Sequence, residues 1–112
     1  MTGAALEDFH RINVYTLELD KLGDKTGPVD VGGASAVTIQ TTLVEGSSWG
    51  SGVLTVERSN DGQTWFSLAS STTISSDTLT AITPDTKYLR VKVSTAGSSG
   101  DRVSVSIYSR LS

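Results

Sequence analysis

Short runs of alternating apolar and polar residues dominate this sequence, and this two-residue period strongly limits how the chain can fold. In the run Tyr88 to Ser94, the apolar residues Leu89, Val91 and Val93 occupy every second position. Successive side chains of a β-strand point to opposite faces, so such a run buries one face and leaves the other in water. We therefore predict an antiparallel strand whose inward face is formed by these three residues.

The same period recurs along most of the chain, and segments rich in Gly, Ser, Asn and Asp separate the runs. A shorter strand is expected around Leu79 and Ile82, before a turn at Pro84 and Asp85. The other predicted strands and their inward residues are 13–19 with Tyr15, Leu17 and Leu19; 34–44 with Val37, Ile39, Thr41 and Leu43; 53–58 with Leu54 and Val56; and a last strand with Val103, Val105 and Ile107.

One turn signal is sharper than the others. The tetrapeptide Ser59-Asn60-Asp61-Gly62 separates the run 53–58 from Gln63 to Leu68, and Asn, Asp and Gly tolerate the left-handed backbone of tight hairpin turns. We predict a β-hairpin here, with either Trp65 or Phe66 facing inward and the other on the opposite side of the sheet. The segment 96–101 is long enough for another hairpin connection.

These patterns predict seven to eight short strands and no alternation of strands with helices. The expected fold is all-β, a single antiparallel β-sandwich, and both immunoglobulin-like and jelly-roll topologies accommodate strands of this number and length. A length of 112 residues suits one hydrophobic core, and no internal repeat or linker divides the chain. We predict an irregular N-terminal arm over residues 1–12, followed by the sandwich domain over residues 13–112.

The side chains needed for most site chemistry are scarce. The chain has no cysteine and one histidine, His10, which falls in the irregular N-terminal segment. A Ser-His-Asp arrangement would require an acid and a serine to converge on this one position, and a closed zinc site needs four nitrogen or sulfur ligands. The loop aspartates form no dense calcium-ligating run. We therefore expect no enzymatic activity, no metal site and no cofactor.

Charge and hydropathy argue against two classes of partner, nucleic acids and membranes. The net charge is −3, and lysines and arginines are scattered rather than gathered in one stripe, which disfavours nucleic acid. No apolar run approaches the roughly 20 residues that cross a bilayer, so no membrane partner is expected.

Two segments are candidates for partner contacts. The N-terminal arm carries Leu6, Phe9 and His10, and a non-periodic arm can become ordered when it docks on a neighbouring subunit. Trp49 lies in a loop of glycines and serines, where its ring could meet a sugar or a protein. The alternative is that Trp49 folds over the end of the sandwich as a plug.

A resemblance connects several of these segments. The stretch Gly52 to Leu68 (GVLTVERSNDGQTWFSL), the strand Tyr88 to Val93 (YLRVKV) and the closing Val103 to Ile107 (VSVSI) resemble small β-sandwich structural proteins of tailed bacteriophages. The resemblance implies a virion component that is made in the host cytoplasm. Its most specific form is a head decoration, or cement, protein that stabilises the capsid by bridging neighbouring subunits. The expected partners are the major capsid protein or another virion protein, together with further copies of this chain in a symmetric oligomer, with a trimer favoured.

The Ser-Asn-Asp-Gly-x-x-Trp hairpin also resembles that of discoidin-like and other carbohydrate-binding sandwiches. The alternative function is therefore a carbohydrate-binding or adhesin-like module, with Trp49 and Trp65 as stacking platforms. Fold-level likeness alone does not separate the two functions.

Overall fold

The computed structural model describes residues 10–46, 48–68, 73–97 and 100–111, and every regular element in them is a β-strand. Nine strands are present in this part of the chain, and β2, β5 and β6 have only two residues each. The strands are β1 (His10–Glu18), β2 (Val29–Asp30), β3 (Ala34–Glu45), β4 (Val53–Ser59), β5 (Phe66–Ser67), β6 (Thr73–Ile74), β7 (Thr78–Ile82), β8 (Tyr88–Thr95) and β9 (Arg102–Leu111).

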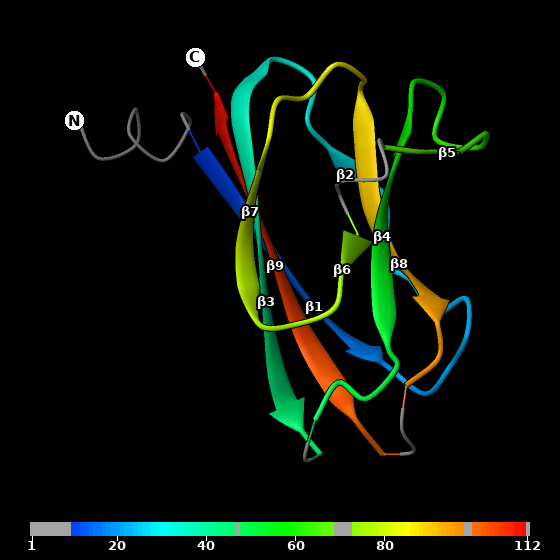
Figure 1. Cartoon of the computed structure of the whole chain (residues 1–112). Coiled ribbons are helices and arrows are strands. Elements are labelled where there is room, and N and C mark those ends of the chain that lie inside the picture. Colours follow the sequence, from blue (N-terminus) through cyan, green and yellow to red (C-terminus); the bar gives the residue numbers. More distant parts are fainter. Residues whose placement is uncertain (1–9, 47, 69–72, 98–99, 112) are drawn as a thin grey trace.

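The strands form two antiparallel sheets that face each other (Figure 1). The four-stranded sheet has the order β1-β9-β3-β7. The five-stranded sheet has the order β2-β8-β4-β5, and β6 also pairs with β4. The predicted all-β sandwich is therefore confirmed.

The strand order selects between the two predicted topologies. With β6 set aside, the antiparallel pairs are nested: β1 with β9, β2 with β8, β3 with β7, and β4 with β5. Successive pairs alternate between the two sheets, which is the jelly-roll arrangement rather than the immunoglobulin one.

The core lies between the sheets and follows the predicted alternation. In the four-stranded sheet Ile39 lies opposite Ile107, and in the five-stranded sheet Val56 lies opposite Val91. All four of these side chains are fully buried, and burying each contributes about 1.5–3 kcal/mol. The buried apolar residues are Leu17, Leu19, Val29, Val31, Val37, Ile39, Trp49, Leu54, Val56, Ile74, Ile82, Leu89, Val91, Val93, Val103, Val105 and Ile107.

One predicted boundary and one predicted connection are wrong. The first strand begins at His10, so residues 10–12, assigned above to an arm, pair with β9 as regular strand. The segment 96–101 is not a hairpin connection, because β8 belongs to the five-stranded sheet and β9 to the four-stranded one. The chain therefore changes sheets between β8 and β9.

The predicted β4–β5 hairpin is confirmed, with a longer loop than expected. Glu57 pairs with Ser67 and Arg58 with Phe66, so the loop runs from Asn60 to Trp65. Gly62 has a φ of 76°, and among the described residues only glycines have a positive φ. Asn60 and Asp61 therefore contribute their side chains, rather than a left-handed backbone, to the turn.

Candidate functional site

The predicted contact residues of the N-terminal arm fall mostly outside the part that the structure describes. Leu6 and Phe9 lie in residues 1–9, which are not described. His10 is the first residue of β1 and pairs with Arg110 of β9 through the backbone register.

Trp49 is buried rather than exposed, with only 8% of its surface accessible. Its Nε1–H donates to Oδ1 of Asp77 at 2.9 Å, and its carbonyl oxygen accepts from the Gly52 N–H at 2.8 Å. Trp49 is the plug of the alternative interpretation, and the expectation of an exposed ring at this position is wrong. The bond from Trp49, followed by one from the Leu43 N–H, lowers the pKa of Asp77 below its ordinary value, because both stabilise the carboxylate.

Trp65 and Phe66 do not divide between core and surface as predicted. Trp65 is half-buried, and its ring centroid lies 4.2 Å from Cζ of Arg90. Arg90 alternates with the buried Leu89 and Val91, so this stack lies on the outer side of the five-stranded sheet. Phe66 is 63% exposed. Neither ring belongs to the core. Trp65 lies in the loop, outside the period of a strand, and Phe66 lies in β5, the last strand in its sheet order.

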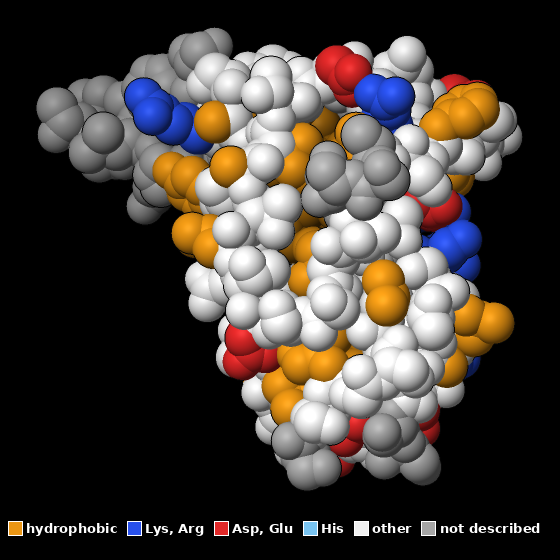
Figure 2. Space-filling view, in the orientation of Figure 1, with side chains coloured by type: hydrophobic (Ala, Val, Ile, Leu, Met, Phe, Trp, Pro, Cys, Tyr) orange, Lys and Arg blue, Asp and Glu red, His pale blue; other side chains and the backbone are white. Residues whose placement is uncertain are grey.

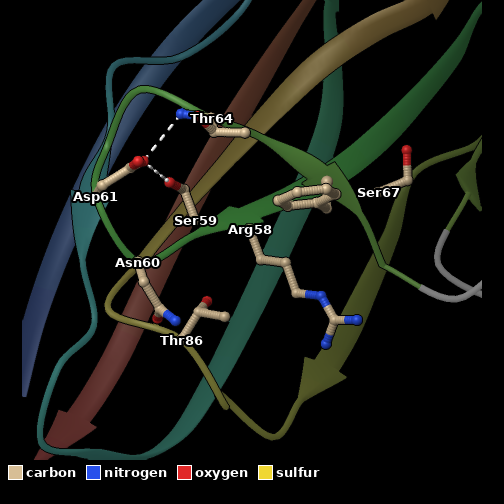
Figure 3. Close-up of a pocket in the computed structure, with 8 residues that line it drawn as sticks. Arg58, Ser59, Asn60, Asp61, Thr64, Ser67 and Thr86 are labelled. Carbon is tan, nitrogen blue, oxygen red and sulfur yellow. Dashed lines mark hydrogen bonds between the residues drawn. The ribbon is translucent and has the colours of Figure 1, made fainter.

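A pocket lies at the end of the β4–β5 hairpin, and we call it the hairpin pocket (Figure 3). Its volume is about 440 Å³, within the range of small-ligand sites. Most of its residues come from the hairpin, and one comes from the loop between β7 and β8. The lining residues are Arg58, Ser59, Asn60, Asp61, Thr64, Phe66, Ser67 and Thr86.

Asp61 organises the loop beside this pocket. Its Oδ1 accepts hydrogen bonds of 2.9 Å from the backbone N–H groups of Thr64 and Gln63 and from the Ser59 hydroxyl. These bonds, led by that from Thr64, lower the pKa of Asp61 from 3.8 to about 2. Ser59 Oγ in turn accepts from the Gly62 N–H at 2.9 Å, which closes the network. Figure 3 shows Asp61, Ser59 and Thr64 drawn together on one side of the pocket.

Two further contacts tie the hairpin to the loop between β7 and β8. Arg58 forms an ion pair of 2.7 Å with Asp85, and Asn60 Oδ1 accepts from the Lys87 N–H at 3.2 Å. The ion pair neutralises the charge of Arg58, so Asp61 carries the remaining charge at the pocket.

Exposed apolar side chains also lie on the outer face of the four-stranded sheet, on its two edge strands β1 and β7. Ile12 and Val14 of β1 are 61% and 63% exposed, and Leu79 of β7 is 64% exposed. Figure 2 shows hydrophobic side chains along the left side of the molecule, outside this sheet. Ile12 pairs with Tyr108 and Val14 with Ser106, and Gln40 lies between Ser106 and Leu79. Apolar side chains therefore flank a more polar centre, and we call the exposed side chains of Ile12 and Val14 the apolar edge.

The described residues contain no group of three or more His, Asp or Glu side chains that could hold a metal ion. No helix that could span a membrane occurs in the described ranges.

Comparisons with known proteins identify a shared fold. No protein-family model and no curated protein matches the chain. The structure is similar to the PBSX exported protein XepA, with a TM-score of 0.57 and 18% identity, over 96% of this chain and 38% of that one. It is also similar to the SPBc2 prophage-derived protein YomS, with a TM-score of 0.52 and 10% identity, over 89% of this chain and 94% of that one.

A weaker similarity, with a TM-score of 0.48 and 12% identity, exists to a family 32 carbohydrate-binding module from C. perfringens NanJ in complex with galactose. It covers 88% of this chain and 93% of that one, and it carries no weight for function. The chain spans less than half of XepA. Identities this low show the fold that the proteins share, and two of these structures come from prophages.

The sequence did not reveal the hairpin pocket. The adjacent aromatics Trp65 and Phe66 were the available signal, since two neighbouring residues of a strand cannot both face the core. Thr86 could not have been assigned to the pocket, because it reaches the site only through the packing of the β7–β8 loop against the hairpin.

Proposed function

We propose that this chain is a non-enzymatic structural protein of a phage virion. Its most specific role would be that of a head decoration protein that bridges neighbouring capsid subunits. Two phage-derived proteins with the same fold support the general role. The proposed partners are the major capsid protein, or another virion protein, and further copies of this chain in a symmetric oligomer such as a trimer.

The observation that carries the proposal is the apolar edge. β1 stands at the end of its sheet order, so only one of its two sides pairs with another strand in the described part of the chain. It is nine residues long and presents Ile12 and Val14 to solvent. A long edge strand with exposed apolar residues is a surface that another chain can cover. A capsid subunit that packs there would remove both side chains from water.

The proposal is tested by mixing the protein with phage particles that lack it and sedimenting the particles. Ile12 and Val14 point outward, so Ile12→Lys with Val14→Lys should leave the fold intact and weaken particle binding by about tenfold or more. Leu22→Lys is the matched control, since Leu22 is 68% exposed in the β1–β2 loop, away from this edge. Wild-type binding by the double variant, or no binding by the wild-type protein, would contradict the proposal.

The predicted carbohydrate-binding alternative loses the features on which it relied. Trp49 is a buried plug, and the Trp65 ring is stacked by Arg90. Trp49 is closed to a ligand and Trp65 already has Arg90 against its ring, so no second function is proposed on the tryptophans.

A further inference from the structure

Phe66 is a large aromatic side chain that the fold leaves open beside a concavity. It is 63% exposed and lines the hairpin pocket. Leaving a phenyl ring in water forfeits the stabilisation that its burial would provide. Another hollow among the described residues, of about 540 Å³, lies beside Trp65, whose ring is already stacked by Arg90. The hairpin pocket therefore offers the more open ring surface of the two.

Hydrogen-bonding groups surround this ring. Asn60 uses its Oδ1 for the Lys87 N–H, and its side-chain amide group supplies donors of its own. Arg58 contributes one nitrogen, Nη1, to the ion pair with Asp85, and a guanidinium has five N–H donors in all. Thr64 and Ser67 add hydroxyl groups at the lining. The pocket thus combines one aromatic surface with several neutral or neutralised polar groups.

The charge of the pocket limits the class of ligand. Arg58 is paired with Asp85, while the Asp61 carboxylate is bound by three donors of its own loop. An anionic ligand would find no uncompensated cation here and would lie near the charge of Asp61. A metal cation would find a single carboxylate in the lining, Asp61, whose Oδ1 already accepts three hydrogen bonds. Both arguments favour a neutral, polyhydroxylated ligand.

The loop is held in place before any ligand arrives. The network of Asp61, Ser59 and Gly62 fixes the turn, and Asn60 is bonded to the neighbouring loop. A site that is already ordered loses little conformational entropy when it binds a ligand. A ligand that makes few contacts, such as a small sugar, can therefore still bind.

We propose that the hairpin pocket binds one unit of a neutral saccharide. The apolar face of the sugar ring packs on Phe66, and its hydroxyl groups bond to Arg58, Asn60 and Thr64. This activity is separate from the assembly function proposed above, since the pocket lies on the five-stranded sheet and the apolar edge on the four-stranded one.

The test is a titration of the isotope-labelled full chain with glucose, galactose or N-acetylglucosamine, followed by amide NMR. At least one sugar should shift signals of residues 58–67 and 86 with millimolar affinity. Phe66→Ala should weaken that binding by about tenfold, and Phe66→Trp should preserve it. Leu79→Ala removes an equally exposed apolar side chain from the other sheet and should change nothing.

Three outcomes would overturn the proposal. One is the absence of shifts with all three sugars at high millimolar concentration, and another is unchanged affinity in Phe66→Ala. The third is that Phe66→Ala abolishes binding to phage particles while no sugar shifts the pocket signals, which would make the pocket a protein contact. Because the titration uses free protein, its failure leaves the particle-binding proposal untouched.

Discussion

At the scale of single residues, two glycines near Trp49 allow close packing. The Gly/Ser-rich composition around Trp49 had instead suggested an exposed loop. A Cβ on Gly97 would lie 2.8 Å from the Trp49 carbonyl oxygen, and one on Gly52 would lie 2.6 Å from Leu19 Cγ. Both distances are too short for a real side chain. The glycines allow backbone and core to approach closely around Trp49. A Gly/Ser-rich segment can mark tight packing as well as an exposed loop tip, and the sequence alone did not separate the two.

The plug role of Trp49 leads to a stability prediction. Trp49→Ala should lower the free energy of unfolding by about 3–5 kcal/mol, because it removes a buried ring and leaves a cavity. Trp65→Ala should cost clearly less, since Trp65 is half-buried and packs outside the core. Urea denaturation of both variants measures the difference. Equal losses for the two variants would show that Trp49 is no more important to the core than Trp65.

At the scale of elements, the strands with apolar residues on the inward face were predicted, whereas the first residues of β1 and the short strands β2 and β6 were not. The strand predicted from Asn13 lacks residues 10–12 of β1, because the apolar Ile12 lies on the outward face and does not continue the inward alternation of Tyr15, Leu17 and Leu19. β2 and β6 have two residues each, and their pairing with β8 and β4 depends on where those strands lie. The periodicity of a short segment cannot show which distant strand that segment pairs with.

The hairpin loop gives an element-scale prediction about pH. Because the pKa of Asp61 is lowered to about 2 in the folded protein, its stabilising effect is fully present above the ordinary value of 3.8. That effect is lost as the pH falls from 3.8 through about 2. Asp61→Ala should therefore lower the urea midpoint at pH 7, and the gap to wild type should narrow as the pH falls through this window.

Gln63→Ala is the matched control for the pH series. Gln63 bonds to Asp61 through its backbone N–H, which the substitution retains, so this variant should follow the wild-type pH profile. A gap between Asp61→Ala and wild type that stays constant down to pH 2 would contradict the role of the ionised carboxylate.

On the scale of the whole molecule, the nested strand pairs were beyond the reach of the sequence. Periodicity shows which face of a strand is buried, but not which strand lies beside it. Here β1 pairs with β9, so that Arg11 lies opposite Ser109 at the two ends of the described chain. The fold class followed from the pattern, whereas the jelly-roll order depends on contacts between segments far apart in sequence.

This topology predicts slow folding. Closing the loops between distant strands costs entropy before their contacts form, so refolding should take milliseconds to seconds rather than microseconds. Stopped-flow fluorescence of a Trp65→Phe variant would follow the burial of Trp49 alone. Complete refolding within the dead time of mixing would contradict the expectation.

The apolar edge and the hairpin pocket lie on different sheets, and this affects how strongly a whole particle could bind a glycan-coated surface. A copy that is fixed to a particle by its apolar edge keeps the hairpin pocket on its other sheet, away from that contact. Many copies on one particle would then repeat the pocket in a regular array. Each pocket would bind a sugar only weakly, but an array that meets a glycan-coated surface binds it at many points at once, and such avidity can exceed the single-site affinity by a factor of roughly 100 or more.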